Sequence, residues 1–239
     1  MMMNQAWINE VEDCSLEEGL LLTANIFPGQ VVFSTSLGQE DQVITHAIAK
    51  AKAAVDIFTL DTGRLFNETY DLLEKTIARY KQPIRVYYPD AASIEQYVNQ
   101  KGINAFYESV ANRKECCHIR KVEPLNRALR GAKIWITGLR ADQSITREEM
   151  KMIEWDEQRS LYKFNPLIHW SLDDVRDYLK TNDVPYNPLH DKGFISIGCA
   201  PCTRALEPGE DIRAGRWWWE DANKKECGLH IMETNNHQA

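Results

Sequence analysis

Short apolar segments alternate with longer amphipathic segments through the first 140 or so residues of the chain. The apolar segments have the length and composition of buried strands and lie at residues 31–33, 55–60, 84–88 and 134–137. The segments between them have helical periodicity and lie at residues 41–52, 67–80, 93–101 and 115–129. Apolar strands that alternate with helices indicate a parallel sheet covered on both faces. We therefore predict an α/β fold whose ligands lie at the carboxyl ends of the strands, near a switch in strand order.

Two further helices are predicted from capping signals. Residues 15–26 begin with Ser-Leu-Glu-Glu, which has the form of a capping box, and residues 171–180 begin with a capping serine. From Tyr186 onward the chain is rich in Pro, Gly and charged residues and shows little periodicity. We therefore divide the chain into an α/β body, residues 1–202, and a flexible C-terminal arm, residues 203–239.

The composition limits the class of protein. With 239 residues, of which 44% are hydrophobic, the chain can bury one good-sized core. It has no apolar stretch of about 18 residues, and its amino end lacks the features of a secretory signal, so we expect a cytoplasmic protein with no membrane span. In the reducing cytoplasm, cysteines serve metals or catalysis more often than disulfides. A formal net charge of −7 argues against nucleic-acid binding, so an anionic substrate would need local clusters of Arg and Lys.

Polar turns follow three of the predicted strands. Residues 34–41, Ser-Thr-Ser-Leu-Gly-Gln-Glu-Asp, lead into a helix, where small side chains and unpaired N–H groups favour binding of a phosphate. The Gly-Lys-Ser/Thr ending of a Walker loop is missing, and an ordinary strand-to-helix turn is the alternative. Residues 60–64, Leu-Asp-Thr-Gly-Arg, form a second such turn, and the two together favour a nucleotide pocket. Arg140 and Arg147 follow a third strand, either as a clamp for phosphate or sulfate oxygens or as part of a solvated loop.

Four of the six cysteines form two close pairs, Cys116-Cys117 and Cys199-Ala-Pro-Cys202. The second pair has the CxxC spacing used for metals and for redox chemistry, and its late, Gly/Pro-rich setting disfavours a redox role. Adjacent side chains on a helix diverge by about 100°, which suits two irons of a four-iron cluster better than a single zinc ion. We therefore predict a [4Fe–4S] cluster, with thiol pairs that bind no metal as the alternative. Lys121 either links the cluster to the substrate electrostatically or lies on an exposed helix face.

A fifth cysteine, Cys227, lies in the predicted arm, 25 positions after Cys202. Two lysines just before it would lower its pKa and favour the thiolate, so it is a candidate nucleophile, with His230 as a candidate donor. The alternative is a spare cysteine near a frayed chain end. We expect Trp217-Trp-Trp219 to hold the arm against the body rather than to stack on a base.

Five segments together resemble the assimilatory adenosine 5′-phosphosulfate (APS) reductases of the iron–sulfur type, and the resemblance runs from about Val31 to His230. The segments are Cys-Cys-His-Ile-Arg-Lys-Val-Glu-Pro-Leu (116–125), Thr-Gly-Leu-Arg-Ala-Asp-Gln-Ser (137–144), Tyr-Asn-Pro-Leu-His-Asp-Lys-Gly (186–193), Ser-Ile-Gly-Cys-Ala-Pro-Cys-Thr-Arg (196–204) and Lys-Glu-Cys-Gly-Leu-His (225–230). The last segment is typical of the wider family, and the paired cysteines are typical of the branch that bears a cluster and uses APS. The resemblance implies an adenine-nucleotide α-hydrolase-like, or PP-loop, fold.

The resemblance also assigns candidate site residues. The nucleotide pocket is expected to be formed by Ser34, Thr35, Ser36, Gly38, Asp61, Thr62 and Gly63. The groups around the phosphosulfate are expected to be Lys121, Arg140, Arg147, Arg213, Arg216 and His230. The ligands of one [4Fe–4S] cluster are expected to be Cys116, Cys117, Cys199 and Cys202. Ala141 stands where many relatives carry Arg.

The expected reaction is the thiol-dependent reduction of APS in sulfate assimilation. The Cys227 thiolate attacks the sulfur of the phosphosulfate, AMP leaves, and the enzyme carries an S-sulfocysteine. Reduced thioredoxin or a similar dithiol protein then releases sulfite. Three alternatives stay open: a reductase of the same family that accepts the 3′-phosphorylated substrate (PAPS), a PP-loop sulfurtransferase, and a noncatalytic metal-binding module. The sequence also leaves open whether the chain forms a homo-oligomer.

Overall fold

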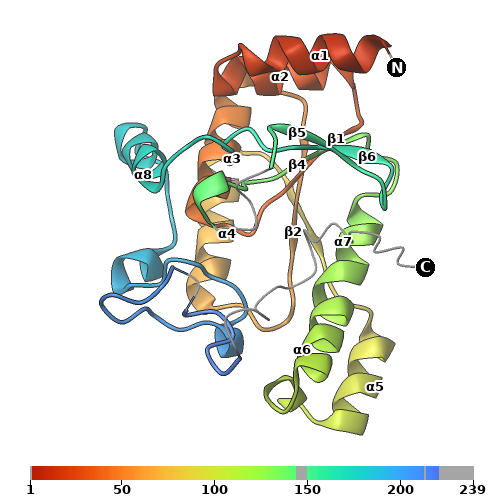
Figure 1. Ribbon diagram of the computed structural model, residues 1–239, viewed down its shortest axis with the longest axis vertical. Coiled ribbons are helices and arrows are strands. Elements are labelled where there is room, and N and C mark those ends of the chain that lie inside the picture. The colour runs from red at the N-terminus through yellow and green to blue at the C-terminus, as the bar shows by residue number, and fades with distance from the viewer. Residues whose placement is uncertain (1, 144–149, 213, 221–239) are drawn as a thin grey trace, which may run out of the picture.

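The computed structural model describes residues 2–143, 150–212 and 214–220, and these contain a six-stranded sheet in the order β3-β2-β1-β4-β6-β5 (Figure 1). Neighbouring strands are parallel throughout, except that β5 is antiparallel to β6. The strands are β1 (Val31–Ser34), β2 (Asp56–Leu60), β3 (Ile84–Tyr87), β4 (Ile134–Ile136), β5 (Ile153–Asp156) and β6 (Leu161–Phe164). The predicted α/β fold with a parallel sheet is confirmed, apart from the antiparallel edge strand β5.

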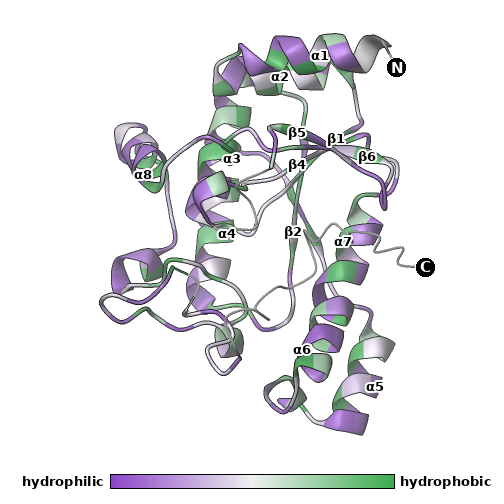
Figure 2. Ribbon diagram, viewed as in Figure 1, coloured by the Kyte–Doolittle hydropathy of each residue, from purple (hydrophilic) through white to green (hydrophobic). Residues whose placement is uncertain are grey.

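Helices cover both faces of this sheet. In Figure 1, α3 and α4 lie to one side of the strands and α6 and α7 to the other, while α1 and α2 pack together beyond the sheet. Hydrophobic and hydrophilic residues mix along each helix (Figure 2), as expected when one helix face is buried and the other solvated. The α-helices are α1 (Met2–Glu12), α2 (Leu16–Ile26), α3 (Gln39–Ala51), α4 (Asn67–Tyr80), α5 (Ala91–Lys101), α6 (Val110–Cys117), α7 (Glu123–Ala128) and α8 (Leu172–Thr181).

The strand order places a topological switch at β1. The chain passes outward from β1 to β2 and then β3, and returns to the opposite side of β1 for β4. Consequently the loops that follow β1 and β4 leave neighbouring strands in opposite directions. A crevice opens between such loops at the carboxyl ends of the strands, which is where the sequence predicted the ligand site.

Most helices lie close to their predicted positions. The capping box of Ser15 with Glu18 opens α2, and a second one, of Ser171 with Asp174, opens α8. The helix predicted at residues 115–129 begins earlier, at Val110, because the Ser109 side chain caps it. It also contains a π-helical segment, His118–Val122, between α6 and α7.

Three elements escaped prediction because their patterns are irregular. Helix α1 has no capping signal in the sequence. In β5 the side chain of Trp155 is about half exposed, and in β6 a buried Lys163 interrupts the apolar pattern. The Lys163 ammonium lies 5.5 Å from the ring centroid of Trp135 in the neighbouring strand, a cation–π contact that makes its burial tolerable.

The first part of the predicted arm packs against the body. Within this part, Thr203 and Arg216 form an antiparallel bridge. The Trp217 N–H donates to Cys202 O of the body at 3.2 Å, and the Trp217 side chain is only 2% exposed. The ring of Trp219 lies 4.5 Å from that of Tyr107, which follows α5 in the chain. The tryptophans therefore hold this segment on the body, as predicted. Residues 221–239 lie outside the described part of the chain. Within the described residues, no helix is both long and apolar enough to cross a membrane.

Helix α1 is expected to contribute strongly to stability through Trp7. Its indole is 1% exposed, donates a hydrogen bond to Thr23 Oγ1 (3.0 Å) and packs edge-on against Phe27 and Phe164. Replacing Trp7 by Ala should lower the free energy of unfolding by about 3–5 kcal/mol, measured by urea denaturation. Trp155→Ala is the matched control, and we expect it to cost about 1 kcal/mol or less because that ring packs mainly on Tyr162. Equal losses for the two variants would contradict the assigned role of α1.

Candidate active site and cysteine cluster

A cavity of about 300 Å³ lies at the switch point, where the loops after β1, β2 and β4 meet residues 190–217. The cavity lies where the sequence predicted the ligand site, at the carboxyl ends of the strands. The residues that line it include Ser34, Thr35, Ser36, Gly38, Glu40, Asp41, Thr62, Lys121, Trp135, Gly138, Arg140, His190, Ser196, Cys199, Arg216 and Trp217.

The loop after β1 is closed by Asp41, which lies in the first turn of α3. The Asp41 carboxylate accepts hydrogen bonds from Ser36, through the backbone N–H (2.5 Å) and the hydroxyl (2.7 Å), and from the backbone of Gly38. Leu37 adopts a left-handed backbone (φ 62°), and its N–H donates to Thr35 Oγ1 at 3.0 Å. The sequence predicted that the N–H groups of this loop are unpaired and open to a phosphate. For Ser36 and Gly38 this is wrong, because the Asp41 carboxylate already accepts hydrogen bonds from both.

Gly138, in the loop after β4, is required by the position of Asp41. A Cβ atom at residue 138 would collide with Asp41 Oδ1 and would lie 3.2 Å from Glu40 Cβ. Only glycine lets the two loops approach this closely. The close contact between Gly138 and Asp41 therefore holds together the two loops on either side of the switch point.

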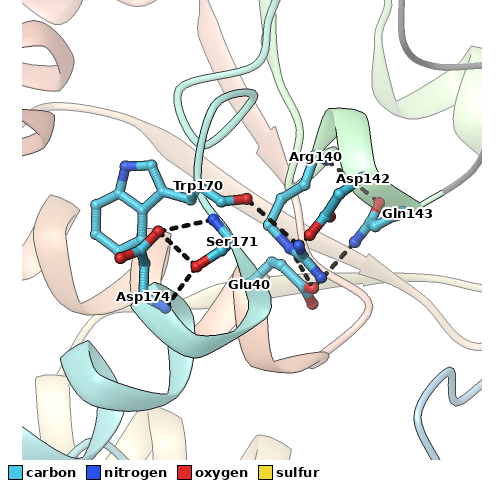
Figure 3. A network of polar contacts seen from close by, with 7 residues as sticks. All are labelled: Glu40, Arg140, Asp142, Gln143, Trp170, Ser171 and Asp174. Carbon is cyan, nitrogen blue, oxygen red and sulfur yellow. Dashed lines mark hydrogen bonds and ion pairs between the residues drawn. The ribbon is translucent and has the colours of Figure 1, made fainter.

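Arg140 forms the centre of a buried polar network (Figure 3). Its guanidinium, 1% exposed, pairs with Glu40 Oε1 at 2.9 Å and with the Asp142 carboxylate. Glu40 also accepts a hydrogen bond from Gln143 Nε2 at 3.0 Å. The network thus joins α3 to the loop after β4, and a substrate anion would share Arg140 with two carboxylates. Its predicted role as a clamp for the substrate stays a prediction.

The turn after β2 faces both the cavity and the cysteines. Thr62 lines the cavity, and its hydroxyl lies 3.2 Å from Cys199 Sγ. Asp61 and Gly63 do not line the cavity. Asp61 instead accepts hydrogen bonds from the Gly63 N–H (2.7 Å) and the Tyr70 hydroxyl (2.9 Å), and Gly63 supplies the left-handed backbone (φ 70°) that the turn needs. Their contribution to the site is therefore to shape the turn.

The four predicted cluster cysteines are buried together around a second, small cavity. Cys116 and Cys117 end α6, and Cys199 and Cys202 flank a short 3₁₀ turn (Ala200–Cys202) that is fixed by a hydrogen bond from Ala200 N to Arg64 O (2.8 Å). The two pairs, 80 or so positions apart in sequence, thus meet in space as predicted. Four basic side chains share this cavity, namely Arg64, Arg113, Arg120 and Lys121.

The charges around the four thiols shift their pKa values in different directions. Burial raises the pKa of Cys202 to about 12, with Cys199 adding to the shift, and burial likewise raises the pKa of Cys116. Burial also acts to raise the pKa of Cys199, but Lys121, the Thr62 hydroxyl and nearby arginines outweigh it, so its pKa is lowered. The surroundings therefore stabilise the thiolate form of Cys199 more than those of Cys116 and Cys202.

The donor set fits a four-iron cluster better than one metal ion. Among the described residues, no three His, Cys, Asp or Glu side chains are grouped tightly enough to hold a single ion. A cubane cluster has its irons at separate corners, so its four thiolates surround a larger volume. In addition, Arg120 Nε and Trp217 Nε1, both beside the small cavity, are buried with no hydrogen-bond partner among the described residues. Such donors suit a sulfur-rich anionic group.

Comparisons with known proteins show which family the chain resembles in sequence. Residues 30–205 match the model of the phosphoadenosine phosphosulfate reductase domain. The chain is 54% identical to an adenosine 5′-phosphosulfate reductase of Burkholderia cepacia over 84% of this chain and 81% of that protein. It is 51% identical to one of Sinorhizobium fredii (strain NBRC 101917 / NGR234), over 94% of this chain and 89% of that protein.

The chain belongs to the phosphoadenosine phosphosulfate reductase family. Among solved structures, the phosphoadenylyl-sulfate reductase of Candida auris in a phosphate complex has a TM-score of 0.71 and 31% identity, covering 84% of this chain and 95% of that one. An FMN adenylyltransferase of Candida glabrata, at a TM-score of 0.55 and 16% identity over 100% of this chain and 77% of that one, shares the fold alone. The predicted PP-loop fold and the predicted membership of the APS reductases, oxidoreductases that act on sulfur, are confirmed.

Several predicted site residues of this family member meet at the boundary of the two cavities. Lys121, Cys199 and Trp217 line both cavities. Arg216 lines the larger one and donates to Ser196 Oγ at 3.1 Å. Its guanidinium lies so close to Gly198 that a side chain there would collide with it. Four predicted residues lie outside the described part of the chain, namely Arg147, Arg213, Cys227 and His230.

Among the lining residues that sequence reasoning missed, two stand out, Trp135 and His190. Trp135 is buried in β4 and looked like an ordinary strand residue, yet its indole N–H donates to Ser34 Oγ at 2.8 Å and fixes the start of the loop after β1. His190 belongs to a motif of the family resemblance but received no role. Its Nε2 is buried with no hydrogen-bond partner among the described residues, and burial lowers its pKa against the opposing effect of Glu40.

The buried Asp41 should make stability depend on pH. Burial, which outweighs the hydrogen bonds from Ser36, raises the pKa of Asp41 from about 3.8 to about 6. The folded state thus binds the proton more tightly than the unfolded state, and the contribution of Asp41 to stability is lost as pH rises through about 6. Relative to Asp41→Asn, the free energy of unfolding of the wild type should therefore fall by about 2 kcal/mol between pH 4.5 and 7.5, as part of a fall of about 3 kcal/mol over the whole range from strongly acid to neutral pH. Denaturation of both proteins from pH 4.5 to 7.5 would measure it, and a flat or rising difference would contradict it.

Proposed function

We propose that this protein reduces adenosine 5′-phosphosulfate to sulfite and AMP by way of an enzyme S-sulfocysteine, with a dithiol protein as the reductant. The observation that carries the proposal is the contact between the two cavities. A ligand cavity at the switch point meets four buried thiols at Lys121 and Cys199, in a chain about half identical to APS reductases. A substrate that carries both a nucleotide and a reducible sulfur group would have a role for both the ligand cavity and the cysteine site.

The nucleotide would occupy the loops after β1, β2 and β4. Small side chains at Ser34, Thr35 and Gly38 leave room for it, and the apolar wall beneath includes Leu60 and Leu125. The phosphosulfate would extend toward Lys121 and Arg216, which line the cavity from distant parts of the sequence. These cations stabilise the charge that builds up when one anion attacks another.

In the proposed first step, the Cys227 thiolate forms a bond to the sulfur of APS, and the bond between that sulfur and the phosphate oxygen breaks. AMP leaves with the electron pair of that bond, and Cys227 becomes S-sulfocysteine. In the second step, a thiolate of reduced thioredoxin, or of a similar dithiol protein, supplies the electrons. The Cys227 thiolate and sulfite are released, and the dithiol becomes a disulfide.

The proposed cofactor is one [4Fe–4S] cluster held by Cys116, Cys117, Cys199 and Cys202. When bound, it would supply a compact charged centre beside the substrate cavity, without a change of oxidation state. Arg120 and Lys121 would offset the negative charge that the cluster and its thiolates carry. Because the chemistry needs reduced thiols, we further propose that the protein acts in the cytoplasm.

Replacing Cys227 by Ser should abolish sulfite release while leaving the brown colour and the iron content unchanged. Sulfite would be assayed with APS and reduced thioredoxin on anaerobically purified protein, and iron by its visible absorbance. Cys202→Ser is the complementary variant, and we expect it to lose the cluster. Sulfite production by Cys227→Ser would remove the nucleophile assignment.

The rival substrate is PAPS, since a family member from Candida auris is a phosphoadenylyl-sulfate reductase of the same fold. We expect kcat/KM for APS to exceed that for PAPS by at least about tenfold, because the extra phosphate requires a cationic partner of its own and costs about 1.4 kcal/mol or more without one. The comparison uses both substrates on the same preparation with reduced thioredoxin. Equal or better turnover of PAPS would overturn the substrate assignment but leave the family unchanged.

A further inference from the structure

A buried ion pair joins the cysteine-bearing helix to the last described residue of the chain. Arg113, in α6, pairs with Glu220 through two bonds, Nε to Oε1 at 3.0 Å and Nη2 to Oε2 at 2.7 Å. The two side chains are 1% and 3% exposed. A bidentate pair shielded from solvent in this way fixes position and orientation, unlike a surface ion pair.

The same pair is reinforced by an aromatic contact. The Arg113 guanidinium lies 4.8 Å from the ring centroid of Trp217, and that of Arg216 lies 4.9 Å from it. The Glu220 N–H donates to Trp217 O at 2.8 Å, so residues 217–220 form one tight turn. Arg113, Trp217 and Glu220 therefore form a connected unit, which we name the root clamp.

The root clamp lies beside the site and at a fixed chain distance from Cys227. Trp217 lines both cavities, and Glu220 is three residues further on. Cys227 follows Glu220 by seven residues in the sequence, a length that spans at most about 25 Å when fully extended. Additional residues between Glu220 and Cys227 would enlarge the volume open to the thiol.

We propose that the Arg113–Glu220 pair is a positioning device, which anchors the start of the reactive segment and so sets the local concentration of the Cys227 thiol at the cavity. This inference rests on the proposed function of Cys227. The local concentration of a tethered group falls roughly as the −3/2 power of tether length once the tether can span the gap. Release back to Trp217 leaves ten residues and should slow sulfonation about twofold, whereas release back to Thr203 leaves twenty-four and should slow it about sixfold.

The test is the rate at which APS alone, with no reductant, adds a sulfite mass to Cys227 in holoprotein, followed by quenched-flow and intact-mass analysis. Glu220→Gln should lower this rate about twofold, with iron content and AMP affinity at the wild-type values, if only residues 218–220 are released. If release extends back to Thr203, the rate should fall about sixfold and AMP should bind more weakly, because Arg216 and Trp217 line the cavity. Glu210→Gln is the matched control. It breaks the partly exposed Arg204–Glu210 pair of the same segment and should leave the rate unchanged.

Two further measurements separate anchoring from general stability. Glycine–serine insertions of three and seventeen residues directly after Glu220 leave the pair intact, and should slow sulfonation about twofold and sixfold by length alone. Trypsin should cleave after Arg216 faster in Glu220→Gln than in the wild type, with or without APS. Unchanged cleavage would overturn the anchor, and insertions without effect on the rate would overturn the positioning role. If the wild type forms no adduct on Cys227, the proposed function fails and the positioning role with it, while the cleavage assay still reports on the anchor.

Discussion

The turn after β2 holds the substrate cavity and the cysteine site in one frame. Thr62 lies at the centre of this turn. Its hydroxyl contacts Cys199 Sγ, and its carbonyl accepts a hydrogen bond from Arg120 Nη1 at 2.6 Å. Two positions on, the carbonyl of Arg64 accepts from Ala200 N. A parallel strand in the middle of a sheet is among the least movable parts of a fold. Both cysteine pairs are thereby fixed relative to the loops that line the larger cavity, although they come from distant parts of the sequence.

The same arrangement concentrates charge where water is scarce. Two anionic groups, an iron–sulfur centre and a phosphosulfate, would lie on either side of Lys121, and neither is tolerated in a dry site without cations. The cations differ in how they are held. Arg113 and Arg140 are already paired with buried carboxylates, whereas Arg120 and Arg216 each keep a buried Nε without a hydrogen-bond partner among the described residues. The first two fix the frame, and the latter two have donors left for a ligand.

The sequence was informative where one local pattern decides the structure. Four strands, the capped helices and the cysteine motifs each depend on residues that are close together in the sequence, and so they were predicted. It was uninformative where a distant partner reverses a local preference. Lys163 is buried in a strand where Trp135 supplies a ring face, and Asp41 can bind the N–H groups after β1 because Gly138 allows its close approach. Trp135 and Gly138 lie far along the chain from Lys163 and Asp41, so no local pattern reveals these contacts.

The π-helical segment after Cys117 explains how one stretch of chain serves both cavities. Arg120 and Lys121 follow Cys116 and Cys117 by four positions each, which in a regular α-helix would put each cation on the face of its own cysteine. Such widened turns are rare and occur frequently at functional sites. Here the turn carries two adjacent cations with different surroundings: Arg120 is buried against the carbonyl of Thr62, and Lys121 lines both cavities. Exchanging the two residues would place a lysine against the Thr62 carbonyl and an arginine at the boundary of the two cavities. The order Arg-Lys after the cysteine pair therefore matters for which cation takes each position, and not only for the amount of positive charge.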